Sequence, residues 1–332
     1  MIYKLDTKID IVIPWVDGND ADWLADKAKY TVEMNEDNHI NRYRDWELLR
    51  YWFRGIEKYA PWVNKVHFIT YGHLPDWLNT NCEKLNVVNH RDYIPKKYLP
   101  VFSSHPIELN MHRIKDLAEH FVYFNDDMFV INELHPKDFF VGGIPADAVV
   151  EVPLRFNPGG IDHIIANNMT LINKHFEKRK VIANNKRQWF SIKNMNAYLK
   201  NLYMLPINGF SAFDNPHLPI PYLKSTLEKV WLEEKTELDY TSSHKFRSTE
   251  DVNQWLFRYW QFAEGNFVQS KTKGKFFSIG KDDGIIEDAI SSQKYKIICL
   301  SDDSLDVDFD KEQKFLENLF LQIFPDKSAF EK

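Results

Sequence analysis

The sequence predicts an α/β protein with a mostly parallel sheet that has helices on both faces. Short apolar runs of strand length alternate with amphipathic segments over the first 130 residues, as in parallel strands joined by crossover helices. These runs end in turn signals such as Asp17-Gly18 or Asn125-Asp126-Asp127. A last apolar run at 296–300 precedes an amphipathic segment at about 310–323, so the C-terminal part is expected to return to the same core.

The expected elements can be placed in chain order. The first strand is the β-branched run from Ile9 to Pro14. A helix is expected from Asp45, because apolar side chains recur on one helical face until Pro61 ends the pattern. The other elements expected in the first half are strands at 66–70, 85–88 and 121–124, a short helix around 75–78 and a helix from 104 or 106 to 117.

The second half is less regular between about residues 151 and 245. It contains the turn-rich run Asn-Pro-Gly-Gly at 157–160 and a helix expected near 222–234. We expect this segment to form an irregular helical lobe or lid. After it, Ser248 is expected to cap a helix that has Asp251 at its third position.

Composition excludes several classes of protein. The 332 residues carry a formal net charge of −6, whereas a nucleic-acid groove needs a dominant basic surface, so no nucleic-acid partner is expected. The two cysteines, Cys82 and Cys299, are too few for a disulfide scaffold and fit a reducing cytoplasm. Nowhere do 18 apolar residues run together, so any membrane contact is expected to be peripheral.

The acidic turn Asn125-Asp126-Asp127 is the strongest candidate for chemistry. It follows the buried run FVYF and precedes MFVI. Two carboxylates held on rigid backbone offer Mg²⁺ or Mn²⁺ the hard oxygen ligands they prefer, and phosphates and water can complete the shell. The structural alternative is a solvated turn, because Asn and Asp are common turn residues. An acidic pair flanked by apolar runs is costly to bury without a cation or another partner.

Four other positions carry weaker signals. Asp17 could bind a nucleotide or a metal, or could only begin an Asp-Gly turn. His217, in DNPHLPIP, could act as a base or donate to a phosphate, but a lone His in a Pro-rich loop is more often structural. Arg247 could hold an anion, or could pair with Glu250 or Asp251. Asp302 and Asp303 follow a strand, although nearby acids suggest an acidic loop.

Several other chemistries lack their motifs. The sequence contains no GxxxxGK[ST] loop and no GxGxxG fingerprint, so it lacks the phosphate cradles of P-loop hydrolases and dinucleotide enzymes. It also contains no GxSxG and no HExxH. Phosphate-directed chemistry by acids, Arg and His from four separate segments remains.

Those four segments resemble the conserved blocks of the Stealth family of sugar-phosphate transferases. The resemblance covers IDIVIPWVDGND at 9–20 and a long block from RDWELLRYWFRGIEKYAPW through FVYFNDDMFV, ending at residue 130. It continues in FDNPHLPIPY, HKFRSTEDVNQWLFRYW and KYKIICLSDD, and in the C-terminal run LFLQIFPDKSAFEK. Glu108, His112, Arg113 and Asp302 match the family pattern, while Ser301 stands where the family usually has Asn.

The resemblance implies a fold, a reaction and a set of roles. The sheet would be Rossmann-like, of the glycosyltransferase-A kind, with a nucleotide-sugar-binding core at 1–150, a lobe contributing to the acceptor site at 151–245, and a return to the core at 246–332. A sugar-1-phosphate would pass from a UDP-sugar to a glycan hydroxyl, with Mg²⁺ or Mn²⁺ at the diphosphate. The metal ligands would be Asp126, Asp127 and Asp302; the catalytic residues would be Arg113, Asp127, His217 and Arg247; donor binding would involve Asp17, Gly18, Arg50, Asn125 and Glu250.

Two alternatives stay open on the sequence. An ordinary metal-dependent glycosyltransferase would also bind a cation at the diphosphate but would release UDP instead of UMP. The spacing of the candidate residues alone does not distinguish these two reactions. A non-catalytic carbohydrate-binding protein would use the many aromatic residues for sugar stacking. For a surface-polysaccharide enzyme, the expected location is the cytoplasm or the inner membrane face, with a glycan acceptor that can be lipid-linked.

Overall fold

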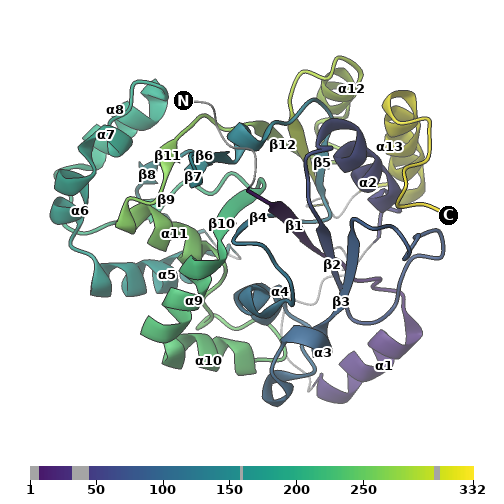
Figure 1. Cartoon of the computed structure of the whole chain (residues 1–332), viewed down its shortest axis with the longest axis horizontal. Coiled ribbons are helices and arrows are strands. Elements are labelled where there is room, and N and C mark those ends of the chain that lie inside the picture. Colours follow the sequence, from purple (N-terminus) through teal and green to yellow (C-terminus); the bar gives the residue numbers. More distant parts are fainter. Residues whose placement is uncertain (1–6, 32–44, 158–159, 303–306) are drawn as a thin grey trace.

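The main sheet has five strands in the order β10-β4-β1-β2-β3 (Figure 1). The computed structural model describes residues 7–31, 45–157, 160–302 and 307–332. Strands β1, β2, β3 and β4 are parallel, and only the edge strand β10 is antiparallel to its neighbour β4. The predicted α/β class with a mostly parallel sheet is therefore confirmed. The strand bounds are β1 Ile9–Pro14, β2 Val66–Thr70, β3 Leu85–Asn89, β4 His120–Tyr123 and β10 Ile220–Leu223.

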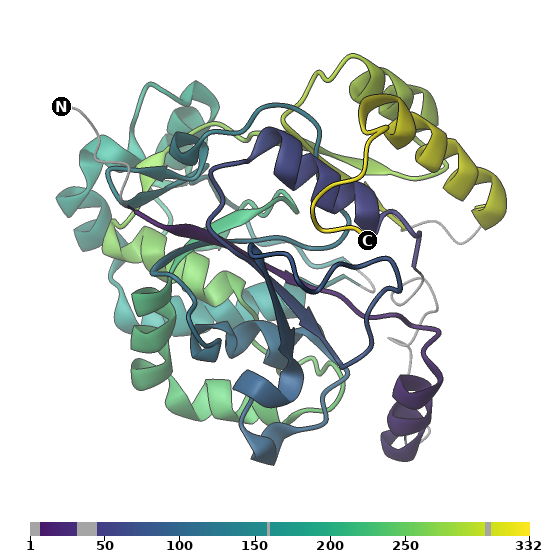
Figure 2. The same ribbon diagram turned by 45° about the vertical axis from the view of Figure 1, so that its right-hand side comes forward.

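Hydrophobic cores lie on both faces of this sheet. Side chains of a strand alternate between faces, so Ile11 and Ile13 pack into one core while Val12 packs into the other. The first core includes α2 (Leu49–Tyr59), α12 (Asp283–Ser291) and α13 (Phe309–Ile323), which lie on one side of the sheet in Figure 2. The second core is covered by α9 (Lys224–Glu233), α11 (Trp255–Glu264) and their neighbours.

A second, three-stranded sheet begins directly after the acidic turn. It contains β5 (Met128–Val130), β12 (Gly274–Ser278) and β13 (Ile297–Ser301). β13 is parallel to β12 and antiparallel to β5, and the Leu300 N–H donates to the Asp127 carbonyl at 2.9 Å. Residues 125–127 therefore join two sheets. This position fixes the backbone of the turn from both sides.

The remaining elements complete the two ends of the molecule. The α-helices are α1 Ala21–Tyr30, α3 His90–Tyr93, α4 Ser104–Leu109, α5 Asp162–His175, α6 Lys178–Asn184, α7 Lys186–Trp189, α8 Met195–Met204 and α10 Lys235–Ser243. The short strands are β6 Phe140–Val141, β7 Ile144–Asp147, β8 Glu151–Val152, β9 Ala212–Phe213 and β11 Val268–Gln269. Three 3-10 turns lie at Lys96–Tyr98, Met111–Arg113 and Pro136–Asp138. Within these described residues, no helix is both long and apolar enough to cross a membrane.

Several helix boundaries in the first half differ from the predictions. Helix α2 begins at Leu49 and not at Asp45, because Glu47 has a φ of 56°, outside the helical region. The short helix expected around 75–78 is a turn, in which Leu78 forms an isolated bridge with Glu331. The helix expected to reach residue 117 ends at Leu109, before a 3-10 turn.

Two differences in the second half bear on the site. The helix expected from Ser248 begins only at Trp255, because the Asp251 carboxylate binds His105 and His244 as well as the Ser248 N–H and holds this segment as a loop. The segment expected as a lobe, 151–245, is largely helical, and it also supplies β10 to the main sheet. The expected helix near 222–234 is present as α9, which starts where β10 ends.

Candidate active site

A large open cleft lies beyond the carboxyl ends of β1, β4 and β13, the edge where parallel sheets bind ligands. Its volume is about 2140 Å³, which exceeds the roughly 300–1,000 Å³ of a pocket for one small ligand. The cleft therefore has room for two substrates side by side. Its walls come from the acidic turn and from three loops, at 215–219, 246–249 and 270–273.

Asp127 lies at the floor of the cleft and uses its two carboxylate oxygens differently. Oδ2 lies 3.1 Å from His217 Nε2 and 3.4 Å from Cys299 Sγ. Oδ1 is buried and has no hydrogen-bond partner among the described residues. A buried carboxylate oxygen without a partner carries a desolvation cost, so this atom is suited to a ligand.

His217 is held against the acidic turn. Its Nε2 also lies 3.3 Å from Asn125 Nδ2. Burial disfavours charge on the imidazole, but the hydrogen bond and the negative charge of Asp127 outweigh it and raise the pKa of His217. The sequence left His217 open as a structural residue. The structure places it against Asp127 in the cleft.

Asp126 faces the cleft beside two other carboxylates. Its side chain is open to water in the cleft but is surrounded by protein on the other sides. This enclosure and the charges of Asp127 and Asp45 raise the pKa of Asp126 to about 7. Burial also raises the pKa of Asp45, and the charge of Asp17 contributes. The floor of the cleft thus holds a concentration of negative charge that a cation would relieve.

The donor set fits a hard divalent cation. Asp127 Oδ1 and the Asp126 carboxylate are oxygen ligands of the type that Mg²⁺ and Mn²⁺ prefer. Asp127, His217 and Cys299 also come close enough to form a mixed oxygen, nitrogen and sulfur group. Burial and the charge of Asp127 raise the pKa of Cys299 well above its usual range. A thiol is also a softer donor than Mg²⁺ or Mn²⁺ prefers. The oxygen donors are the better match.

Two more predicted residues line the cleft. Asp302 follows β13 and accepts a hydrogen bond from Trp46 Nε1 at 3.2 Å. Arg247 lies exposed at the rim, where its Nη2 is 3.4 Å from Ser104 Oγ. The neighbouring Asp303 lies outside the described residues. Arg247 and Asp302 thus reach the same cleft as Asp127 from distant parts of the chain.

Five predicted residues do not line the cleft. Asp17 and Gly18 form a turn in which Asp17 Oδ1 accepts from the Asn19 N–H at 2.8 Å, as the turn alternative implied. Arg50 lies over the ring of Trp77, and Arg113 is exposed over the ring of Trp231. Glu250 is exposed and accepts from the Tyr240 hydroxyl. Asp17 nevertheless affects the cleft indirectly, because its charge helps to raise the pKa of Asp45.

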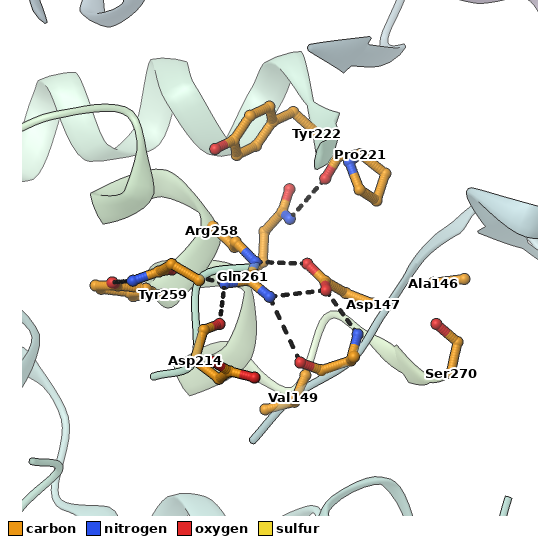
Figure 3. Close-up of polar contacts among 12 residues, drawn as sticks. Ala146, Asp147, Val149, Asp214, Pro221, Tyr222, Arg258, Tyr259, Gln261 and Ser270 are labelled. Atoms are coloured by element: carbon orange, nitrogen blue, oxygen red, sulfur yellow. Dashed lines mark hydrogen bonds and ion pairs between the residues drawn. The ribbon is translucent and has the colours of Figure 1, made fainter. Parts of the chain in front are cut away.

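A buried ion pair supports the loop that carries His217 (Figure 3). Arg258, on α11, donates to both oxygens of Asp147 at 2.7 and 2.9 Å. Its Nη1 donates to the Asp214 carbonyl and to Asn215 Oδ1, both at 2.8 Å. Arg258 therefore fixes the chain two residues before His217, and its own charge is fully compensated.

A second His–Asp group at the cleft was not predicted from the sequence. His105 Nδ1 lies 2.7 Å from Asp251 Oδ2, and His244 Nδ1 lies 2.6 Å from Asp251 Oδ1. Asp251 is fully buried, while His105 lines the cleft. Glu108, which matches the family pattern, is also buried and accepts from the Tyr123 hydroxyl at 2.9 Å. Helical spacing places Glu108 one turn after His105, and this was the available signal.

Comparisons with known proteins match the parts of the chain that supply the cleft residues. Three family models match the chain: Stealth conserved region 1 at residues 7–31, conserved region 2 at 42–146 and conserved region 3 at 216–262. The capsular polysaccharide phosphotransferase WcwK of Streptococcus pneumoniae is 41% identical over 329 residues, which is 98% of each chain. The chain belongs to the Stealth family. Conserved region 2 contains the acidic turn, and conserved region 3 contains His217 and Arg247.

Other relatives within the family match over the same length. The receptor polysaccharide phosphotransferase WefC of Streptococcus gordonii is 40% identical and covers 98% of this chain and 99% of its own. The exopolysaccharide phosphotransferase cps2G of Lactiplantibacillus plantarum is 38% identical, with 98% and 96% covered. Among solved structures, the galactosyltransferase LgtC in complex with donor and acceptor sugar analogs is 11% identical, with a TM-score of 0.41 and 94% and 95% covered.

Proposed function

We propose that this Stealth protein transfers a hexose or N-acetylhexosamine 1-phosphate from a UDP-sugar to a glycan hydroxyl. The product is a phosphodiester in a capsular or exopolysaccharide, and UMP leaves. One observation carries the proposal: in Asp127, one carboxylate oxygen binds His217, while the other is buried in a carboxylate-lined cleft without a hydrogen-bond partner among the described residues. The similarity to polysaccharide phosphotransferases supports phosphoryl transfer over glycosyl transfer.

The reaction forms one bond and breaks one bond at the β-phosphorus of the donor. The acceptor oxygen bonds to this phosphorus, and the bond from the phosphorus to the bridging oxygen of the diphosphate breaks. UMP departs with the electron pair of that bond, and the acceptor proton passes to a base. The bond between the sugar and its phosphate is not touched, so the sugar keeps its anomeric configuration.

His217 is the proposed base for the acceptor hydroxyl. A general base needs a proton-accepting nitrogen near the reacting oxygen and a pKa near the working pH. Asp127 Oδ2 fixes the ring and stabilises the imidazolium that forms. The hydrogen bonds that Arg258 donates to the Asp214 carbonyl and to Asn215 Oδ1 keep the loop of His217 in place. Once protonated, His217 can donate to a phosphoryl oxygen.

We propose that a divalent cation and Arg247 together stabilise the negative charge of the transferring phosphate. Asp126, Asp127 and Asp302 would hold Mg²⁺ or Mn²⁺, which when bound neutralises the diphosphate. Arg247 at the rim would bind a phosphate oxygen, since a guanidinium suits phosphate geometry. Asn125 lines the same wall and would orient the donor. We therefore propose that the protein is a transferase of substituted phosphate groups.

The acceptor is proposed to be a growing glycan, free or lipid-linked, at the inner face of the membrane. The 2140 Å³ cleft can take an oligosaccharide end beside the nucleotide-sugar. Exposed aromatic side chains at the cleft, such as Phe276, offer a stacking surface for sugar rings.

Product analysis separates the proposed reaction from its alternatives. The protein is incubated with candidate UDP-sugars, an acceptor glycan and Mg²⁺, and the released nucleotide is identified. UMP in equal amount to the new product is expected. UDP as the sole nucleotide would establish ordinary glycosyl transfer, and sugar binding that resists EDTA without turnover of any donor would establish a binding protein.

A further inference from the structure

The helix α8 and its flanks carry an exposed apolar surface. Exposed large hydrophobic side chains concentrate between residues 192 and 207, where Tyr203 is 78% exposed and Leu199 is 58% exposed. We call this surface the α8 apolar face; its members are Ile192, Met195, Leu199, Leu202, Tyr203, Leu205 and Ile207. It lies at one end of the long axis of the molecule, opposite α12 and α13 (Figure 1). Apolar patches of this kind on a protein surface mark contact sites.

Helical geometry gathers these side chains on one side of α8. Met195, Leu199 and Leu202 are spaced by four and three residues and lie on the outer side. Ala197, Asn201 and Met204 lie on the opposite side and are buried. An ordinary surface helix has its polar face outside. The apolar outer face of α8 is therefore unusual for a helix that is exposed to water.

The protein fixes α8 firmly from its inner side. Asn201 Nδ2 donates to the carbonyls of Val149 and Trp189 at 3.0 and 3.2 Å, and its Oδ1 accepts from the Glu151 N–H at 2.8 Å. At its N-terminus, Asn194 Nδ2 donates to the Ser270 carbonyl at 2.8 Å. The outer face is therefore presented to solvent by a helix that is anchored to the body of the protein.

The surroundings of the α8 apolar face are strongly basic. From residue 163 to residue 213 the sequence has eight Lys and Arg and one acid, Glu177, within a chain of net charge −6. Six of these bases are exposed on or near α6, α7 and α8, namely Arg179, Lys180, Lys186, Arg187, Lys193 and Lys200, and of these Lys180 pairs with Glu177. Basic charge is thus concentrated on the same part of the molecule as the exposed apolar side chains.

We propose that the α8 apolar face docks on a membrane surface with anionic headgroups. An amphipathic helix of this composition lies in the plane of the interface, with its apolar side chains at the headgroup boundary and its bases against the lipid charge. The charge decides between occupants. A second copy of this chain would bring two basic segments together, whereas an anionic bilayer complements them.

Docking in this way brings the cleft close to the membrane. The contact of Asn194 joins α8 to Ser270, and residues 270–273 line the cleft wall. A lipid-linked acceptor would then reach the cleft without leaving the surface, which rests on the proposed function. The docking itself needs neither donor nor acceptor, so it is testable without turnover.

Vesicle co-sedimentation of the full chain tests the docking. Vesicles of phosphatidylcholine with and without about a third of phosphatidylglycerol are used at low and high salt. We expect binding to the anionic vesicles, a fall as salt rises, and a loss of at least about tenfold for Leu199→Ser/Leu202→Ser/Tyr203→Ser. The matched control, Leu232→Ser/Ile285→Ser/Leu321→Ser, changes equally exposed side chains on other helices and should bind as the parent protein does.

A charge pair completes the test. Lys193→Gln/Lys200→Gln should weaken binding by about fivefold per lysine, while Lys115→Gln/Lys235→Gln, two exposed lysines elsewhere, should not. Circular dichroism and release of UMP in solution should be unchanged for all four variants, which separates a failed docking from a failed function. Equal sedimentation of the triple variant and its control would overturn the proposal, as would a concentration-dependent dimer that the triple variant abolishes without any vesicle binding.

Discussion

Two neighbouring groups of charged side chains are built in opposite ways: the Arg258 ion pair lies inside the protein, whereas the carboxylates of the acidic turn face the cleft. The nitrogen atoms of the Arg258 guanidinium all donate hydrogen bonds. Nε and Nη2 donate to the Asp147 carboxylate, and Nη1 donates to the Asp214 carbonyl and to Asn215 Oδ1. The floor of the cleft has three carboxylates, from Asp45, Asp126 and Asp127, and one carboxylate oxygen without a partner among the described residues.

The contrast separates support from chemistry. A compensated ion pair holds its surroundings in one arrangement, whereas an uncompensated cluster of acids in a cleft is typical of a functional site. Burial raises the pKa of Asp126 to about 7 with the help of like charges, while the charge of Arg258 overcomes burial and lowers the pKa of Asp147. Substitutions in the two groups should therefore have different effects.

The largest expected effect is on activity, from Asp127→Asn. We expect kcat/KM to fall by about 1,000-fold or more, because the substitution weakens both the cation site and the support of His217. The free energy of unfolding should stay within about 1 kcal/mol of the parent value, since a carboxylate is removed from like charges. Steady-state kinetics and urea melts check both statements. Full activity in this variant would show that Asp127 is not in the catalytic machinery.

Arg258→Met should act chiefly on stability. The variant leaves Asp147 buried without its partner, and breaking a buried pair costs about 3 kcal/mol or more. The double variant Arg258→Met/Asp147→Leu should recover much of this loss, because no uncompensated charge remains. A single variant as stable as the parent protein would contradict the view that this pair supports the fold.

The stabilisation gained when a divalent cation is added back after EDTA treatment should also distinguish the two groups. Addition of Mg²⁺ or Mn²⁺ at about 100 times its dissociation constant contributes about 2.7 kcal/mol, which corresponds to a rise in Tm of several degrees. This rise is expected for the parent protein after EDTA treatment and for Arg258→Met, but not for Asp127→Asn. Equal shifts in parent protein and Asp127→Asn, measured by differential scanning fluorimetry, would exclude the proposed site.

The smallest expected effect is the pH dependence of the supporting pair. The pKa of Asp147 is lower in the folded protein than its usual value of 3.8, so its contribution is complete above that value and is lost as the pH falls below it. Urea melts of the parent protein should therefore lose stability below about pH 4. In Asp147→Asn the loss over the same range should be smaller, and an identical pH profile would contradict this assignment.

The sequence predicted the scaffold and several residues that line the cleft, but not the contacts that hold these residues in place. Each strand of the parallel sheet was recognisable, because a buried strand is a local apolar run. Asp127 was recognisable because acids follow such a run. Its partner Cys299 lies 172 residues away in the sequence, and Asp251 and His105, which form a hydrogen bond, are 146 residues apart. No local pattern encodes these contacts, since they depend on how the two sheets and α11 pack together.

Two places where the structure differs from the local sequence pattern have the same origin. Ser248 looks like a helix cap, but Asp251 is drawn to His105 and His244 and the helix starts at Trp255. Arg113 matches the family pattern, yet it stacks on Trp231 outside the cleft. In both places, tertiary contacts decide between two roles that are equally compatible with the local sequence.

The fate of the β-phosphorus of the donor is the most direct test of the proposed reaction. A UDP-sugar labelled with ³²P at the β-position is supplied with acceptor glycan and Mg²⁺, and the label is followed after separation of nucleotide from glycan. If sugar-1-phosphate is transferred, the label moves to the glycan while unlabelled UMP is released. Label that stays entirely in UDP, with sugar on the glycan, would contradict the proposed reaction.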